Sequence, residues 1–273
     1  YALAQSPQIF KQLLMISGFE RYYQVARCFR DEDLRADRQL DFTQVDIEAS
    51  FLSEEEFQTH MEKMMVRVFK NVLDRDLEVP FERLSFKEAL NRFGSDKPDM
   101  RFGWELIDLN DIFKDSQFQV FNKEGISIKG IVIDDGASST RKEIDGYTNL
   151  VKKYGAKGLV TLKVNDNQLS GPAVKFFSEQ EIEALFNTLN LKENDFVCIV
   201  ADEWETACNA LGALRLHFRD KYEAIKDPEE FKFVWIVDFP MFEEDPETKA
   251  LIARHHPFTR PKVSSIEELD QNP

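Results

Sequence analysis

Two neighbouring stretches, YYQVARCFR at residues 22–30 and DFTQVDIE at residues 41–48, decide the fold of this chain. Both alternate apolar and polar side chains, which is typical of β-strands. Because successive side chains of a strand point to opposite faces, the second strand has one polar and one apolar face. The polar face carries Phe42, Gln44, Asp46 and Glu48, and the apolar face carries Thr43, Val45 and Ile47. We expect the apolar face to be structural.

The first strand repeats this pattern, with Tyr23, Val25 and Phe29 on one face and Gln24, Cys28 and Arg30 on the other. If the two strands pair as a hairpin, Arg30 ends beside a floor of carboxylates and an amide. Such a floor can hold an ammonium group, and an arginine fork can grip a phosphate or carboxylate at two points. An aromatic ring on the same face can stack on a planar base. The pattern therefore predicts a site for an amino acid and a nucleotide.

A half-buried sheet edge with its polar side in water would show the same alternation. The connecting loop favours a site, because residues 31–40 interleave arginines with acidic residues and contain neither Gly nor Pro. A loop that only reverses the chain usually carries turn residues.

The same region resembles a known family. Residues 29–32 (FRDE), with Gln39 and Phe42, resemble motif 2 of the class II aminoacyl-tRNA synthetases, and residues 35–46 resemble its bacterial aspartyl branch. Upstream, residues 5–12 (QSPQIFKQ) are similar to the flexible loop that closes over aspartate in that branch. Downstream, residues 255–259 (HHPFT) are similar to its paired-histidine segment. The three motifs follow the family's order, and the resemblance covers essentially the whole chain.

The resemblance implies an α+β fold: part of the antiparallel-sheet catalytic core with an inserted α/β domain, which is shared with the B subunit of the amidotransferase acting on misacylated tRNA. The turn-rich residues 94–99 separate the two parts. We predict catalytic core at residues 1–100 and 228–273, and the insert at residues 101–227. The chain begins at Tyr1 without an initiator methionine and ends at Pro273. We expect a fragment that lacks the anticodon-binding domain, motif 1 and motif 3 and is inactive alone.

Local signals predict the elements. A capping box at Ser53 and Glu56 begins a helix whose Met-rich stripe (Phe57, Met61, Met64, Val68, Val72) we interpret as core, and a second helix lies between Ser85 and Gly94. In the insert, strand-like runs occur at residues 126–133, 158–164 and 196–200, and helix-like runs at residues 141–154, 179–189 and 203–219. This alternation predicts an α/β or α+β insert. A strand at residues 231–240 and a short one from Ala250 lead to His255 and His256.

The resemblance also implies roles. Arg30 would be catalytic, neutralising the α-phosphate of ATP and the attacking carboxylate. Aspartate would be bound by Ser6, Gln8, Lys11, Arg30, Gln44, Asp46 and His255, with Lys11 suited to its side-chain carboxylate. ATP would be bound by Arg30, Asp31, Glu32, Gln39, Phe42 and His256. Tandem histidines on a strand point to opposite faces, so a surface pair without a role is the alternative.

The expected partners are L-aspartate, ATP as substrate, tRNA(Asp) and, in the full-length enzyme, a second copy. Mg²⁺ is expected with its main ligands outside this chain, and no metal ligand is assigned within it. Three cysteines at no metal spacing predict free thiols. No apolar run approaches the roughly 20 residues that cross a bilayer, so we expect a cytoplasmic protein without membrane contact. A net charge of −15 argues against a broad basic surface for nucleic acid.

Two alternatives stay open. The chain could be a non-catalytic module that binds tRNA or a protein through the insert. It could also belong to a related enzyme for asparagine or lysine, against which the insert and residues 35–39 argue. Charging of tRNA(Asp) alone and of tRNA(Asn) as well are both compatible, because residues that read the anticodon would lie upstream.

Overall fold

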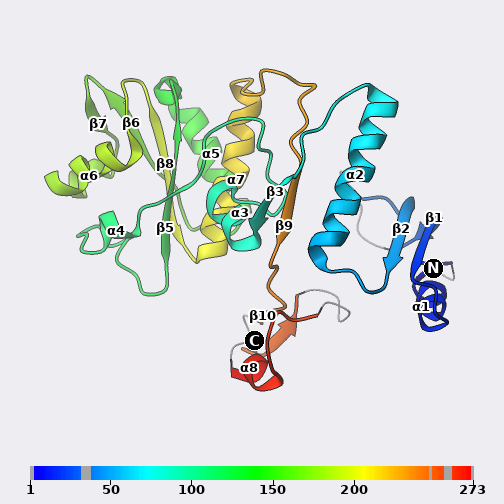
Figure 1. Cartoon of the computed structure of the whole chain (residues 1–273). Coiled ribbons are helices and arrows are strands. Elements are labelled where there is room, and N and C mark those ends of the chain that lie inside the picture. The colour runs from blue at the N-terminus through cyan, green and yellow to red at the C-terminus, as the bar shows by residue number, and fades with distance from the viewer. Residues whose placement is uncertain (1–2, 32–37, 246–247, 255–259, 272–273) are drawn as a thin grey trace. The chain divides into compact units, whose positions relative to one another are not determined.

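The computed structural model describes residues 3–31, 38–245, 248–254 and 260–271. The chain divides into two compact units, Tyr1–Pro80 and Phe81–Pro273 (Figure 1). The first unit holds α1 (Gln8–Ile16), β1 (Arg21–Phe29), β2 (Asp41–Ala49) and α2 (Glu54–Leu73).

β1 and β2 form the predicted antiparallel hairpin. Gln24 lies opposite Asp46, and Tyr22 lies opposite Glu48. Because alternate residues share a face, these side chains lie together on the polar face. The predicted pairing and the predicted polar face are therefore confirmed.

The apolar face of the hairpin is not the covered one. Tyr23, Val25 and Val45 on this face are 79%, 66% and 59% exposed. The expectation that this face is structural was wrong for the described residues, since α1 contacts the polar face instead, where Lys11 reaches Asp46.

α1 replaces most of the predicted flexible loop. Its residues Gln, Lys, Leu and Met are good helix formers. Before the helix, the carbonyl oxygen of Ala4 accepts a hydrogen bond from the backbone N–H of Phe29 at 2.9 Å. The helix is followed by Gly18, whose φ of +94° returns the chain to β1. The segment that resembles a closing loop is thus helical from Gln8 onward.

α2 begins with the predicted capping box. The hydroxyl of Ser53 accepts from the N–H of Glu56 at 3.2 Å, and the Glu56 carboxylate accepts from the N–H of Ser53 at 2.8 Å. The prediction that the Met-rich stripe is core was wrong: none of its five residues is buried, and Met64, Val68 and Val72 are 36%, 47% and 73% exposed. The buried residues of α2 are Gln58 and Glu62 instead. Helical spacing identified the apolar face of the helix but not what covers it.

The second unit contains a five-stranded sheet of order β4-β5-β8-β6-β7. Its strands are β4 (Ile107–Asp108), β5 (Ser127–Ile133), β6 (Val160–Asn165), β7 (Gln168–Ser170) and β8 (Phe196–Asp202). Every neighbouring pair is antiparallel. In the centre of the sheet, β8 lies between β5 and β6 and runs opposite to both. This part of the chain is therefore α+β, one of the two arrangements that the alternation left open, and not the α/β domain that the resemblance implied.

Helices cover both faces of this sheet (Figure 1). They are α4 (Asn110–Phe113), α5 (Arg141–Lys153), α6 (Glu179–Leu189) and α7 (Trp204–Lys221), with 3-10 turns at Gly136–Ser138 and Val174–Phe176. Cys198 and Val200 of β8 pack in one core cluster with residues of α5 and α7, while Val197 and Ile199 pack in another with residues of α4 and α6. Burial on both faces explains why the predicted strands read as continuous apolar runs.

The rest of the second unit is made of smaller elements. They are β3 (Glu82–Ser85), α3 (Phe86–Phe93), β9 (Val234–Val237), β10 (Phe242–Glu244), β11 (Leu251–Ala253) and α8 (Ile266–Gln271). β3 and β9 pair in parallel, and β10 and β11 pair antiparallel. α3 begins at the predicted Ser85 cap and ends at Gly94, where φ is +66°.

Two buried contacts attach α7 to its surroundings. α7 and α3 approach so closely that a Cβ atom on Gly212 would lie 2.2 Å from the carbonyl oxygen of Gly94. Arg215 is 1% exposed, and its guanidinium donates to backbone carbonyls of Asp99, Phe102, Gly103 and Trp104 at 3.0–3.1 Å. Burial lowers the pKa of Arg215 to about 10. The four carbonyl oxygens of residues 99–104 provide the hydrogen-bond acceptors that this buried guanidinium needs.

Cys28, Cys198 and Cys208 are buried free thiols, as their spacing predicted. Burial raises the pKa of Cys208 to about 11. Within the described residues, no group of three or more His, Cys, Asp or Glu could hold a metal ion. Among the helices described, none is both long and apolar enough to span a bilayer.

Candidate functional site

The polar face of the β1–β2 hairpin, hereafter the hairpin face, brings small and charged residues together. Along β1 it presents Tyr22, Gln24, Ala26 and Cys28, which lie opposite Glu48, Asp46, Gln44 and Phe42 of β2. Ala26 and Cys28 are 7% and 0% exposed. Because the side chains of Ala26 and Cys28 are small, the longer side chains opposite them on β2 project further from the sheet.

Asp46 is the centre of the hairpin face. Its Oδ1 atom lies 3.0 Å from Nζ of Lys11 and accepts from Nε2 of Gln44 at 3.2 Å. The residue is 8% exposed, and its Oδ2 atom is buried without a hydrogen-bond partner among the described residues. Buried polar atoms in native proteins are nearly always paired, so this carboxylate oxygen requires a donor, which a water molecule or a group of a ligand can supply.

Lys11 is held by two carboxylates. Its Nζ atom also lies 3.2 Å from Oε2 of Glu48. Burial lowers the pKa of Lys11, but the hydrogen bonds to Asp46 and Glu48 outweigh burial, so the pKa lies above its ordinary value. Lys11 is therefore charged at neutral pH. An ammonium group has three donors, and the two carboxylates occupy two of them.

Arg30 and Phe42 form the other end of the hairpin face. The Arg30 guanidinium carbon lies 5.1 Å from the centroid of the Phe42 ring, a cation–π contact. The backbone N–H of Arg30 donates to Leu40 at 2.8 Å, which extends the hairpin ladder. No carboxylate pairs with this guanidinium in the part of the chain that the structure describes.

The other predicted site residues are less closely joined. Ser6 and Gln8 lie at the start of α1, and no hydrogen bond or ion pair connects them to the rest of the predicted set among the described residues. Asp31 and Gln39 are exposed where the strands end. Glu32, His255 and His256 lie outside the described residues, so their predicted roles stay predictions.

Residues outside the predicted aspartate and ATP contacts also belong to this face. Glu48 shares Lys11 with Asp46, and Tyr22 donates its hydroxyl hydrogen to Oε1 of Gln24 at 2.6 Å. Partial burial raises the pKa of Tyr22, and the Asp46 carboxylate raises it further. The alternation of polar residues identifies Glu48 and Gln24, and the hairpin register would have added Tyr22.

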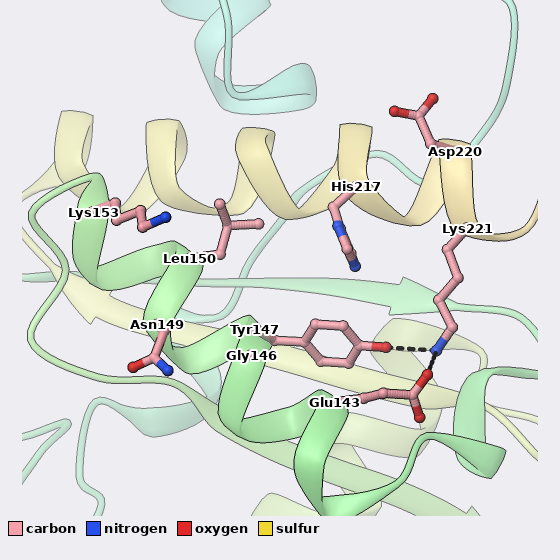
Figure 2. A pocket seen from close by; sticks show the side chains of 9 residues that line it. All are labelled: Glu143, Gly146, Tyr147, Asn149, Leu150, Lys153, His217, Asp220 and Lys221. Carbon is pink, nitrogen blue, oxygen red and sulfur yellow. Dashed lines mark hydrogen bonds and ion pairs between the residues drawn. The ribbon is translucent and has the colours of Figure 1, made fainter.

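A groove between α5 and α7 in the second unit is a second place where a ligand could bind (Figure 2). It has a volume of about 660 Å³ and is lined by Glu143, Gly146, Tyr147, Asn149, Leu150, Lys153, His217, Asp220 and Lys221. Lys221 donates to the Tyr147 hydroxyl at 2.6 Å and pairs with Glu143 at 2.8 Å. With two lysines and two acidic residues, the lining has no surplus of positive charge. The groove therefore lacks the basic character that a tRNA-binding module would need.

Comparison with known proteins identifies the family of the chain. The sequence pattern of the family tRNA synthetases class II (D, K and N) matches residues 1–272. The chain is 50% identical to the aspartate–tRNA(Asp/Asn) ligase of Caldanaerobacter subterraneus subsp. tengcongensis, covering 100% of this chain and 46% of that protein. It is 51% identical to the aspartate–tRNA ligase of Halalkalibacterium halodurans, again covering 100% of this chain and 46% of that protein.

The chain thus spans about half the length of the curated relatives that it matches. Among solved structures, the hypothetical protein PH0730 from Pyrococcus horikoshii OT3 aligns with 38% of this chain and 55% of its own at 20% identity, with a TM-score of 0.27, too low to argue from. The family match extends over nearly every residue and includes the hairpin and the helix that supplies Lys11. The chain belongs to the class II tRNA synthetases of the D, K and N group.

Proposed function

We propose that this chain contributes the amino-acid and ATP sites of an aspartate–tRNA ligase. The observation that carries the proposal is the buried Asp46 carboxylate, whose Oδ2 atom has no partner among the described residues while Oδ1 holds Lys11. The relatives named aspartate–tRNA ligases, at 50% and 51% identity over the whole chain, support this choice.

Aspartate would lie on the hairpin face. Its α-ammonium group would bind the unpaired Oδ2 atom of Asp46, beside Gln44. Its side-chain carboxylate would accept the third donor of Lys11, which the two carboxylates leave unused. Asparagine would offer a neutral amide there, and the buried ammonium would lose an ionic partner. Ser6, Gln8 and His255 would complete this pocket.

ATP would lie at the other end of the hairpin face. The α-carboxylate of aspartate would attack the α-phosphorus of ATP, and a P–O bond would form as the bond to pyrophosphate breaks. Arg30 would stabilise the negative charge that develops there, and its two-point fork suits a phosphate. Adenine would stack on Phe42, whose ring also contacts the Arg30 guanidinium, and Glu32 would accept from the adenine amino group.

The remaining ATP contacts would come from Asp31, Gln39 and His256. A terminal adenosine hydroxyl of tRNA(Asp) would then attack the activated carbonyl, and AMP would leave. Mg²⁺ would compensate phosphate charge, but the described residues offer no ligand set, so no step is assigned to it.

The wider setting follows from the same proposal. The chain would be part of a longer homodimeric enzyme of the cytoplasm, with core at residues 1–100 and 228–273. The sheet-containing insert, residues 101–227, would be the domain shared with the amidotransferase B subunit.

ATP–pyrophosphate exchange in the full-length protein tests the proposal. Exchange should require aspartate, and asparagine or lysine should not replace it. Asp46→Asn should raise the KM for aspartate, while Asp41→Asn should not, because Asp41 lies on the same strand but on the opposite face. Absence of aspartate-dependent exchange, or equal exchange with asparagine, would contradict the proposal.

A further inference from the structure

Strand β11 is followed by Arg254, whose side chain reaches helix α7. Nη1 of Arg254 lies 2.6 Å from Oε1 of Glu205, and Nη2 lies 3.1 Å from Oε2. The two side chains are 24% and 40% exposed. Such a two-point pair fixes direction as well as distance, which a lysine at this position could not do.

The surroundings of Arg254 hold it further. Its guanidinium lies 5.0 Å from the ring centroid of Phe86, and that ring packs on Phe239 at 5.2 Å. Its Nε atom lies 3.5 Å from a carboxylate oxygen of Glu243. The backbone N–H of Arg254 donates to Met241 at 3.0 Å. Both the backbone and the side chain of Arg254 are therefore restrained.

The partner of Arg254 stands on a rigid support. Glu205 lies in the first turn of α7, where the helix dipole favours a negative charge. The neighbouring Trp204 donates from Nε1 to Asn91 of α3 at 2.8 Å. One turn further, Cys208 packs in a buried cluster with Phe86 and Leu90. The pair between Glu205 and Arg254 therefore holds the end of β11 at a fixed place relative to α7.

We propose that Arg254 is a positioning residue, through which α7 fixes the point where the chain leaves β11, immediately before His255 and His256. This inference rests on the proposed function, which assigns those histidines to aspartate and ATP. α7 belongs to the insert and β11 to the returning core segment. The insert therefore acts on substrate affinity through a contact that touches no substrate.

The kinetic test uses the full-length protein. Arg254→Gln and Glu205→Gln should each raise the KM for aspartate and ATP on the order of tenfold, since an ångström-scale misplacement of binding groups is costly. The double variant should be no worse than either single variant, because both remove the same pair. Exchanging the two charges (Arg254→Glu with Glu205→Arg) should recover part of the affinity.

The matched control is Arg92, which forms a similar two-point pair with Glu105, at 2.8 Å for both bonds and with side chains 33% and 44% exposed. It does not adjoin the histidine segment in sequence. Arg92→Gln should leave both KM values unchanged. Wild-type KM values in Arg254→Gln, or an equal rise in Arg92→Gln, would overturn the proposal.

A second measurement does not depend on activity. Hydrogen exchange of the β10–β11 backbone amides should quicken in Arg254→Gln and not in Arg92→Gln. Unchanged hydrogen exchange in Arg254→Gln would overturn the positioning role even if the KM values rose. If the wild-type protein lacked aspartate-dependent activity while the amides responded as expected, the proposed function would fail and the positioning of β11 would stand.

Discussion

The Nζ atom of Lys11 lies 3.0 Å from Oδ1 of Asp46, which joins a helix residue to a strand residue 35 positions further along the chain. The same carboxylate keeps its second oxygen buried and without a partner among the described residues. One oxygen of this carboxylate thus holds the ammonium group of Lys11, while the other stays buried. This arrangement distinguishes the hairpin face from a solvated sheet edge, the alternative that alternation alone left open.

Replacing Lys11 tests how the side chain of the amino acid is chosen. A hydrogen bond between charged groups contributes about 1.5–3 kcal/mol. Lys11→Gln should therefore raise the KM for aspartate roughly 10- to 150-fold. The preference for aspartate over asparagine should fall as well. Exchange kinetics with both amino acids measure this, and Lys70→Gln, an exposed lysine of α2, is the control. An unchanged KM in Lys11→Gln would show that the side-chain carboxylate binds elsewhere.

Asp99 should make the second unit sensitive to acid. Its carboxylate accepts two hydrogen bonds from Arg101 at 2.9 Å and one from Arg219 at 3.1 Å. Hydrogen bonds from Arg101 outweigh burial and, with Arg219, hold the pKa of Asp99 at about 2, below the ordinary 3.8. Because the pKa is lower in the folded state, this stabilisation of about 2 kcal/mol is present above pH 3.8 and lost as pH falls toward 2.

Urea unfolding at a series of pH values measures this effect. Asp99→Asn should remove the fall in stability between pH 3.8 and 2. Asp220→Asn should keep it, because Asp220 also pairs with Arg219 but is 70% exposed. The same pH profile in wild type and Asp99→Asn would rule this role out.

Two helix glycines should respond in opposite directions to the same substitution. Alanine in a helix is usually more stabilising than glycine by about 0.5–1 kcal/mol. Gly146→Ala in α5 should show this gain, since nothing lies within 4 Å of the added Cβ. Gly212→Ala in α7 should instead destabilise by about 1–3 kcal/mol, because overpacking moves the backbone of α3. Denaturant midpoints compare the two, and a gain at Gly212 would mean that α3 and α7 separate easily.

Local signals explain what could be predicted of the fold. The caps at Ser53 and Ser85 and the left-handed Gly94 depend only on neighbouring residues, and the structure shows them as expected. The order of the sheet could not be predicted in this way. β8 lies between β5 and β6 through contacts of residues far apart in the chain, and this makes the five-stranded sheet antiparallel. The exposure of the α2 stripe likewise depends on packing partners and not on spacing.

For the site, the sequence predicted which residues share a face but not the contacts between them. Alternation identified Gln44 and Asp46 as neighbours on one face, and the resemblance supplied Lys11. Neither could show that Lys11 already pairs with Asp46 and Glu48, because that contact depends on how α1 crosses the hairpin. The Tyr22–Gln24 hydrogen bond needed the hairpin register.

Replacing Arg30 tests whether the hairpin face takes part in aspartate activation or is only a polar surface. Arg27 is the matched residue, because it lies on the same strand, points to the opposite face and pairs with Asp41. Aspartate-dependent ATP–pyrophosphate exchange should be measured in the full-length protein with each arginine replaced by alanine. We predict that Arg30→Ala abolishes exchange and that Arg27→Ala retains it. Exchange near the wild-type rate in Arg30→Ala would contradict the role of the hairpin face in aspartate activation.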